Sequence, residues 1–254
     1  MNNYYRNLIA DEFRNCVNDT IERVMGTEQT YRPFHMALLS EDVVFWSAFE
    51  RSFSTSFGQR VIEEIARLVA LSNGATNARR QVKTIVHIDA AYENAIREEM
   101  RLLRRRNRMP ECAWHPTLQR VLQAHPSGRD VDIRVISDLW WNKDGVDNYI
   151  SLKTVKPNID QTTVAKEDCL YLAVNNPNCN VYFGLPYNPY GECKEDYAHN
   201  PPMGIFDFRH DPVVLIGKEM WDTIGGYGCY EELLDIAAEV GEETRRCIME
   251  RLRR

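Results

Sequence analysis

Long hydrophobic runs are missing from this sequence. No stretch approaches the roughly 20 apolar residues that span a bilayer, and the mean hydropathy is -0.46. The opening residues, MNNYYRNLIADEF, carry acidic side chains and lack the apolar segment of a secretory signal. Internal repeats and low-complexity tracts are also missing. These absences predict a cytoplasmic protein with no membrane association.

An excess of basic charge is missing as well. The chain has 31 Lys and Arg against 37 Asp and Glu, which gives a formal net charge of -6. This balance argues against a nonspecific DNA-binding protein with a wholly basic surface. It leaves specific DNA binding open, because local charge distribution decides that interaction.

The seven cysteines show no disulfide or metal-binding pattern. Their number is odd, their spacing is irregular, and there is no C-x-x-C. We interpret them as reduced thiols. The alternative is a zinc site built from Cys112, His115, Cys193 and His199. The spacing within those pairs is poor for zinc.

Hydrophobic periodicity changes along the 254 residues, of which 44% are hydrophobic. The first part shows helical spacing, whereas β-branched and aromatic runs appear after residue 128. We expect helices at 57–71, 89–107, 162–174 and 230–252, a hairpin over 132–155, strands at 180–185 and 212–216, and a long loop at 186–212. This order predicts an α/β fold with a mixed sheet flanked by helices.

We interpret residues 1–254 as a single domain, because a core of this size needs no disulfide or metal to be stable. Residues 1–110 form its mainly helical part, with helix breaks near Gly26 and Pro33. Residues 128–217 hold the sheet and the long loop, and residues 218–254 form C-terminal helices.

The predicted hairpin brings reactive side chains together. Its two apolar runs flank Asp144-Gly145, which is a typical turn signal. With the turn centred on Gly145, Asp138 would lie opposite Leu152, beside Ser151 and Lys153. Ser151 and Lys153 share one face of the sheet, because they are two residues apart. Burying unpartnered charge is costly, so either a structural ion pair or a catalytic site would explain this cluster.

The catalytic explanation is metal-assisted hydrolysis of a phosphodiester. That reaction uses one or two carboxylates to hold Mg²⁺ near the phosphate. It also uses a lysine to orient or deprotonate the attacking water and to offset negative charge. Asp138 and Lys153 supply one carboxylate and the lysine, and the hairpin offers Ser151 in place of a second acid.

Residues 137–161 (SDLWWNKDGVDNYISLKTVKPNIDQ) resemble the active-site hairpin of PD-(D/E)XK nucleases. Residues 150–161 (ISLKTVKPNIDQ) are similar, more narrowly, to type II restriction endonucleases of the TdeIII type. The likeness runs from the helix at 57–71 to VVLIGKEMWD at 213–222. It implies a restriction-endonuclease-like core with extra N-terminal helices.

The resemblance has two departures from the superfamily pattern. Ser137 replaces a proline that carries no chemistry, and Ser151 replaces an acidic residue. In related enzymes with this serine, the carboxylate comes from the following helix, which here corresponds to Glu167. The resemblance therefore implies Asp138, Lys153 and Glu167 as catalytic residues, with Ser151 as a supporting hydroxyl.

The same resemblance implies Asp138 and Glu167 as metal ligands, and Glu64 as a further ligand from the helix at 57–71. Each glutamate has an alternative interpretation. Glu167 stands between Lys166 and Asp168, which is typical of a surface segment. Glu63 and Glu64 together could form the solvated rim of an amphipathic helix.

Three groups of residues are candidate DNA contacts. Arg97, Arg101, Arg104 and Arg108 recur on one helical face and suit phosphate contacts, unless acids elsewhere pair with them. Polar side chains after the catalytic strand and in the long loop suit base or phosphate contacts. These are Lys156, Asn158, Asp160 and Gln161 after the strand, and Tyr187, Asn188, Tyr190, Lys194 and Arg209 in the loop. Turn formation and helix capping would also explain Asn158 and Asp160.

The resemblance implies a sequence-specific, Mg²⁺-dependent endonuclease of a restriction–modification system. Its partners would be double-stranded DNA and, functionally, a DNA methyltransferase that shares its site. A GC-rich palindrome such as GGNCC is implied, and a homodimer would match its two-fold symmetry. The alternatives are an inactive DNA-binding protein with the nuclease fold, and an interaction protein whose hairpin holds a buried ion pair.

Overall fold

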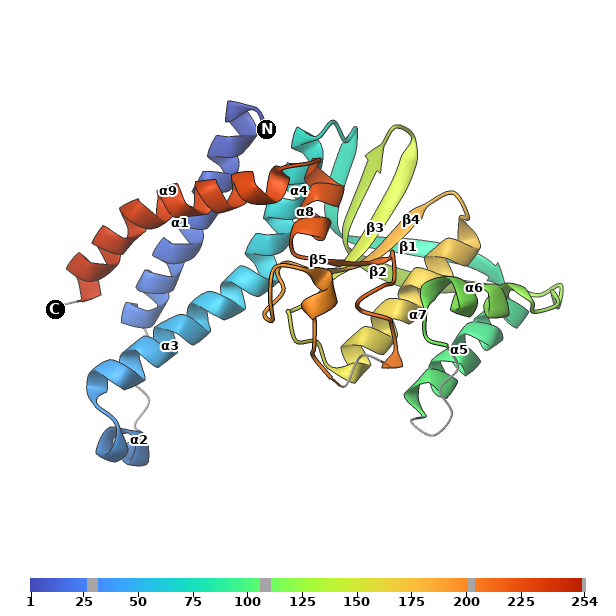
Figure 1. Cartoon of the computed structure of the whole chain (residues 1–254), viewed down its shortest axis with the longest axis horizontal. Helices are drawn as coiled ribbons and strands as arrows, with labels where there is room; N and C mark the ends of the chain where they lie inside the picture. The colour runs from blue at the N-terminus through green and yellow to red at the C-terminus, as the bar shows by residue number, and fades with distance from the viewer. Residues whose placement is uncertain (27–31, 106–110, 201–203, 253–254) are drawn as a thin grey trace.

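The computed structural model describes residues 1–26, 32–105, 111–200 and 204–252 (Figure 1). Arg108 of the predicted basic face lies outside them. The helices are α1 (Asn3–Gly26), α2 (Pro33–Leu38), α3 (Glu41–Ser56), the π-helical η1 (Phe57–Val61), α4 (Ile62–Ser72), α5 (Ala90–Arg104), α6 (Trp114–Leu122), α7 (Ile159–Asn175), the 3₁₀ turn η2 (Lys194–Asp196), α8 (Lys218–Gly225) and α9 (Cys229–Leu252). The strands are β1 (Asn77–Asp89), β2 (Asp130–Lys143), β3 (Val146–Leu152), β4 (Asn180–Leu185) and β5 (Val214–Ile216).

The five strands form one mixed sheet in the order β1-β2-β3-β4-β5. The first three are antiparallel, and β4 and β5 continue parallel to β3. Helices cover both faces of the sheet (Figure 1). One core includes side chains of α5, α6 and α7, and a second core includes side chains of α1, α4, α8 and α9. This arrangement confirms the predicted α/β fold with a mixed, helix-flanked sheet.

The β2–β3 hairpin differs from its prediction by one residue. Lys143 pairs with Val146, so Asp144 and Gly145 alone form the turn. Both have positive φ, 53° and 78°, as a two-residue type I′ turn requires. Leu139 therefore pairs with Ile150, and the same register sets Asp138 opposite Ser151 rather than Leu152.

Strand β1 was not predicted from the sequence, because residues 1–110 were interpreted as mainly helical. Its inward residues include Val86 and Ile88, which are buried, while Lys83, Ile85 and His87 are exposed. This alternation is typical of a half-buried strand. Strand β1 pairs with β2 from Asn77 to Asp89, with one interruption at Gln81 and Asp138, so the N-terminal half contributes an edge of the sheet that carries Asp138.

The sequence predicts that a new helix begins at residue 57, but the chain is already helical before that residue. Ser56 has αR backbone angles and makes no capping hydrogen bond through its side chain. Helix α3 instead continues through η1 into α4. The first part of α3 and the short α2 project from the rest of the molecule (Figure 1), and neither helix has a buried residue.

The segment at 186–212 is more structured than a mobile loop. It contains η2, and its aromatic residues Tyr197, Phe206 and Phe208 are fully buried. The rings of Tyr197 and Phe208 stack with centroids 5.0 Å apart. Among the described residues, no helix combines the length and apolarity needed to cross a membrane.

Candidate active site

Asp138 accepts hydrogen bonds from three consecutive residues of the neighbouring chain segment. Its Oδ2 accepts from the Ser151 hydroxyl at 3.2 Å, the Leu152 amide at 2.7 Å and the Lys153 ammonium at 3.0 Å. The Asp138 and Lys153 side chains are only 17% and 23% exposed. The predicted cluster of carboxylate, hydroxyl and ammonium is therefore present. The two-residue turn and the pairing of β2 with β3 bring these groups together.

The strands separate at this point. Backbone pairing of β2 with β3 ends at Leu139 and Ile150. The next inward-facing amide, that of Leu152, donates to the Asp138 side chain. The Lys153 amide faces the other way and donates to the Gly184 carbonyl of β4 at 3.0 Å. The reactive groups thus stand at a fork, where β3 leaves β2 and stays bound to β4.

Gln81 completes the hydrogen bonding of Asp138. Its amide nitrogen donates to Asp138 Oδ1 at 3.1 Å and to Glu63 Oε1 at 2.9 Å. The backbone of Gln81 has φ 50°, which is rare for a residue with a Cβ. Such strain persists only where surrounding contacts impose it, and it is concentrated at functional sites. Sequence analysis did not identify Gln81 as a site residue, because it did not predict strand β1.

Helix α4 sends Glu63 toward the fork, and Glu64 pairs elsewhere. Glu64 forms a bidentate ion pair with Arg67 and accepts from Arg80 at 3.2 Å. Glu63 shares Gln81 with Asp138. Burial and the negative charge of Asp138 raise the pKa of the Glu63 carboxyl above its usual range. The residue that interacts with the site is thus the direct neighbour of the one expected.

Helix α7 presents two acids in different directions. Glu167 accepts a hydrogen bond from the Tyr171 hydroxyl at 3.1 Å, and Tyr171 in turn interacts with Arg97. The pKa of Asp168 depends instead, besides burial, on the charges of Asp138 and Lys153. Burial chiefly, with the charges of Glu167 and Asp138, raises the pKa of Asp168 to about 7, and the Lys153 charge opposes this. Asp168, which was not predicted as a site residue, is thus the α7 carboxyl whose pKa depends on the charges of Asp138 and Lys153, and Glu167 as a catalytic residue stays a prediction.

The carboxylates around the fork suit a hard cation. Among Glu63, Asp138 and Asp168, the Lys153 ammonium contacts Asp138 alone. The pKa values of Glu63 and Asp168 are raised chiefly by burial and partly by the Asp138 charge, and the Lys153 charge opposes both shifts. Within the described ranges, no three His, Cys, Asp or Glu side chains form a ready metal-binding group. Mg²⁺ commonly takes only one or two protein carboxylates and fills its shell with water and phosphate. The donor set therefore fits such a cation, with Asp138 at its centre.

The predicted basic face of α5 is paired with acids. Arg97 lies 2.7 Å from Glu93, Arg101 pairs with Glu98, and Arg104 pairs with Asp160. All three arginines are about half exposed or more. Exposed pairs of this kind are weak, so DNA phosphates could exchange for the carboxylates.

The polar residues after β3 first serve to start α7. Asn158 is the N-cap, and its side chain accepts from the Gln161 amide at 2.8 Å. Gln161 Oε1 accepts from the Asn158 amide at 3.1 Å. This is a complete capping box. Lys156 is exposed and lies over the Tyr190 ring, 5.6 Å from its centroid.

The candidate contacts in the 186–212 segment divide into two groups. Lys194 and Arg209 hold the segment together, because Lys194 donates to the Asp211 carbonyl at 2.8 Å and Arg209 to the Tyr197 carbonyl at 3.0 Å. Tyr187 and Tyr190 are exposed. Asn188 uses its side chain to donate to the Cys193 carbonyl at 2.6 Å. The exposed tyrosines and Lys156 are thus the more available groups.

Fold and site together define a class. A mixed sheet between helical layers is consistent with a restriction-endonuclease-like fold, and Asp138 and Lys153 lie at the open end of its hairpin. The family model described as "Type II restriction endonuclease, HinfI" matches residues 1–241. The chain belongs to this family, and it is a site-specific deoxyribonuclease that acts on double-stranded DNA.

Curated relatives agree with the family. The chain is 27% identical to the type II restriction enzyme HgiCII of Herpetosiphon aurantiacus over 88% of this chain and 82% of that one. It is also 27% identical to HgiEI of the same organism, over 93% and 86% of the two chains. No solved structure matches. The comparisons confirm a type II restriction endonuclease, and the narrower TdeIII type stays a prediction.

Proposed function

We propose that this endonuclease hydrolyses phosphodiesters with Mg²⁺, at a GC-rich palindrome such as GGNCC, as a homodimer in the cytoplasm. Its functional partner would be a DNA methyltransferase of the same restriction–modification system. The observation that carries the proposal is the contact between Asp138 and Lys153 at the strand fork. In the proposal, residues 1–254 form one catalytic unit with one such site.

In this proposal each site residue has a separate role. Asp138 would hold the cation, which when bound polarises the scissile phosphate. Lys153 would orient the attacking water or accept its proton, and would offset the charge that builds up on the phosphate. The water oxygen would bond to phosphorus as the bond to the leaving sugar oxygen breaks, and that oxygen would take up a proton from solvent water. Ser151 would keep the Asp138 carboxylate oriented, as its 3.2 Å hydrogen bond supports.

We propose Asp168 as the second carboxylate, in place of Glu167. The electrostatic coupling of Asp168 to Asp138 and Lys153 supports this choice, and the bond of Glu167 to Tyr171 supports a structural role for that glutamate. Glu63 would act through Gln81 to position Asp138. Glu64, paired with two arginines, would stabilise α4 and β1 rather than bind metal.

We propose that DNA contacts come from α5 and from the surface around β3. Arg97, Arg101 and Arg104 would release their carboxylates and bind phosphates. Lys156 and Tyr190, which lie against each other, would be closest to bases. Asn158, Asp160, Gln161, Lys194 and Arg209 would support these elements through the hydrogen bonds and ion pairs described above.

Cleavage of unmethylated phage DNA tests the proposal. The purified chain with Mg²⁺ should produce discrete fragments, and sequencing their ends should give one palindrome. With Ca²⁺ in place of Mg²⁺, the chain should bind the same DNA without cutting it. Cutting that persists in EDTA would contradict the metal requirement, and random fragment ends would contradict the specificity.

The second candidate function is that of an inactive DNA-binding protein. One observation favours it, namely that Ser151 stands where the superfamily pattern has an acid. Under this alternative the chain binds a specific sequence in Ca²⁺ and leaves plasmid DNA supercoiled in Mg²⁺. Under the main proposal the same Mg²⁺ incubation linearises a plasmid that carries the site.

A further inference from the structure

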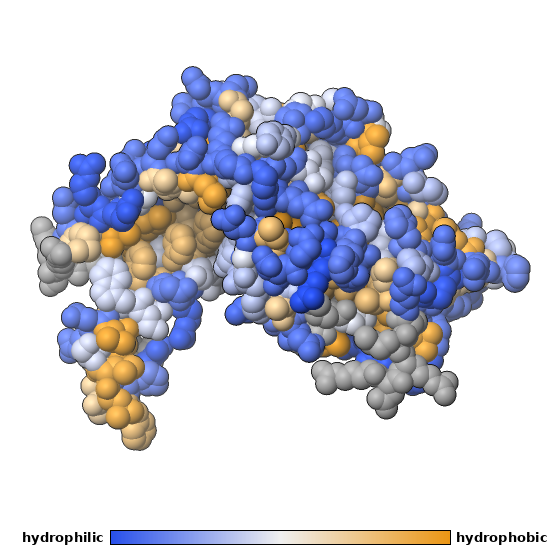
Figure 2. Space-filling view, viewed as in Figure 1, coloured by the Kyte–Doolittle hydropathy of each residue, from blue (hydrophilic) through white to orange (hydrophobic). Residues whose placement is uncertain are grey.

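Residues 33–46, here called the arm, expose many large apolar side chains for so short a segment. It comprises α2, the turn after it and the start of α3, and it projects from the molecule (Figure 1). Six of its large hydrophobic side chains are exposed by 38–82%, namely Phe34, Met36, Leu38, Leu39, Val43 and Trp46. Figure 2 shows an apolar area at this tip of the molecule. Short helices of this kind are marginal in water unless they pack.

The exposed apolar area of the arm is that of an interface. Two of the six side chains, Phe34 and Trp46, are aromatic and measure about 150–250 Å² each; with the exposed parts of the four smaller ones, the area is on the order of 600 Å². That is the upper end of the largest apolar patch on a typical monomer, about 300–600 Å². It also approaches the roughly 800 Å² that each partner buries in a stable interface.

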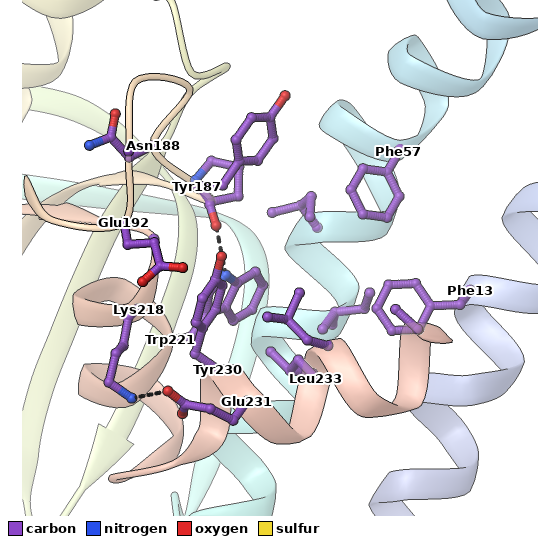
Figure 3. A pocket seen from close by; sticks show the side chains of 17 residues that line it. Phe13, Phe57, Tyr187, Asn188, Glu192, Lys218, Trp221, Tyr230, Glu231 and Leu233 are labelled. Carbon is purple, nitrogen blue, oxygen red and sulfur yellow. Dashed lines mark hydrogen bonds and ion pairs between the residues drawn. The ribbon is translucent and has the colours of Figure 1, made fainter. Parts of the chain in front are cut away.

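The same chain contains an apolar hollow of matching character. A cavity of about 680 Å³ lies between α1, α4, α8, α9 and the chain after β4 (Figure 3). Its walls are mostly apolar and include Phe13, Phe57, Trp221, Leu233 and Leu234. Leu234 at its rim is 53% exposed. Volume and lining suit aromatic and aliphatic side chains such as those of the arm.

We propose that the arm of each chain packs into the hollow of a second copy. In a two-fold pair each copy gives one arm and receives one, so both apolar surfaces are buried twice. The inference rests on the proposed homodimer and names the surfaces that form it. A single Asp138–Lys153 site per chain supports the need for a second copy, because two DNA strands must be cut.

Sedimentation equilibrium of the full chain without DNA tests the proposal. At about 10 µM protein the mass should be twice the 29.6 kDa of one chain. Leu38→Asp in the arm and Leu234→Asp at the hollow should each give a monomer, because each buries a charge in an apolar contact. Ser47→Asp, which is exposed on α3 outside the arm, is the matched control and should stay dimeric. Circular dichroism should show all three folded.

Mixing the two monomeric variants distinguishes arm-into-hollow packing from arm-against-arm packing. A mixed pair keeps one intact contact, between the Leu38 arm of one chain and the Leu234 hollow of the other. Equimolar mixing should therefore restore dimer in part. A monomeric wild type, a dimeric Leu38→Asp variant, or a dimeric Leu234→Asp variant would each overturn the proposal.

Plasmid cleavage separates this inference from the proposed function. A wild type that is dimeric but leaves DNA intact would contradict the nuclease chemistry and leave the arm contact in place. A wild type that cuts as a monomer would contradict the arm contact and leave the chemistry in place.

Discussion

The sheet region and the arm contain the same kinds of side chain in opposite environments. Phe183 of β4 and Leu139 of β2 are 0% exposed, whereas Phe34 and Leu38 of the arm are 80% and 82% exposed. Burying one such side chain contributes about 1.5–3 kcal/mol. The apolar residues of the sheet therefore stabilise the single chain, and those of the arm leave that free energy available for association.

The difference also separates chemistry from assembly. All the groups that contact Asp138 come from β1 and β3 or the residue after β3. None of them belongs to α2 or α3. Substitutions in the two regions should therefore change different observables, and the predictions below test that separation.

The largest effect should come from the core of the sheet. Phe183→Ala should lower the free energy of unfolding by about 3–5 kcal/mol, because it removes a fully buried ring and leaves a cavity. Phe34→Ala should change it by less than about 0.5 kcal/mol in protein dilute enough to be monomeric. Urea unfolding measures both. Similar losses for the two variants would show that the arm belongs to the folding core.

Lys153→Met should slow cleavage by about 10²–10³-fold, because it removes a preorganised charge from the reacting phosphate. DNA binding in Ca²⁺ and the melting temperature should change little. Lys143→Met, at the turn end of the same hairpin, is the control and should cut normally. Single-turnover cleavage measures the rate, and near-normal cutting by Lys153→Met would remove this lysine from the mechanism.

Asp168→Asn should raise the Mg²⁺ concentration needed for cleavage by at least about 10–100-fold, because the loss of a group that merely supports a metal ligand already has that effect. Glu167→Gln should change it only a few-fold, because its side chain bonds Tyr171. A Mg²⁺ titration of both variants measures this contrast. The reverse order of effects would restore Glu167 as the second carboxylate.

Lys166 predicts a pH dependence of stability. Burial lowers its pKa to about 8, while its amine donates to the Ile205 carbonyl at 2.7 Å. Between pH 8 and 10.5 the unfolded chain binds this proton more tightly than the folded chain. Stability should therefore rise with pH across that window, by about 1–3 kcal/mol relative to Lys166→Met. Parallel pH profiles from urea unfolding would refute this.

The smallest effect should come from the exposed face of α5. Arg101→Ala should leave stability almost unchanged, because exposed ion pairs are weak. If Arg101 exchanges Glu98 for a phosphate, the slope of log affinity against log salt should fall by about 0.9. Fluorescence anisotropy in Ca²⁺ measures the slope. An unchanged slope would mean that this face stays away from DNA.

Much of the site could be predicted from local sequence. The hairpin followed from two β-branched runs around Asp144-Gly145, and the Asp138–Lys153 contact followed from the hairpin. The register was wrong by one residue, because turn geometry rather than the position of the glycine sets it. Strand β1 was missed, because charged residues on its exposed face obscured the alternation.

The two helix acids could not be chosen from the sequence. Helix α7 buries Thr162, Thr163, Lys166 and Cys169 among others, so its contacts extend round most of the helix and no narrow apolar stripe fixes its rotation. Adjacent residues on a helix differ by about 100° in direction. A rotation of that size decides between Glu167 and Asp168 on α7, and between Glu63 and Glu64 on α4. It depends on packing that only the fold defines.

The fork at Asp138 couples sheet integrity to the chemistry. The Leu152 N–H donates to a side-chain oxygen of Asp138, where a regular strand pair would offer a backbone carbonyl. The same carboxylate therefore completes the pairing of the two strands and serves as the central ligand proposed here. An amide in its place would still offer an oxygen to that N–H, whereas a methyl group would leave the N–H without an acceptor. A substitution of Asp138 can therefore remove the negative charge without removing the acceptor that the Leu152 N–H needs. Natural variants at this position would retain an acceptor even after the nuclease had lost its activity.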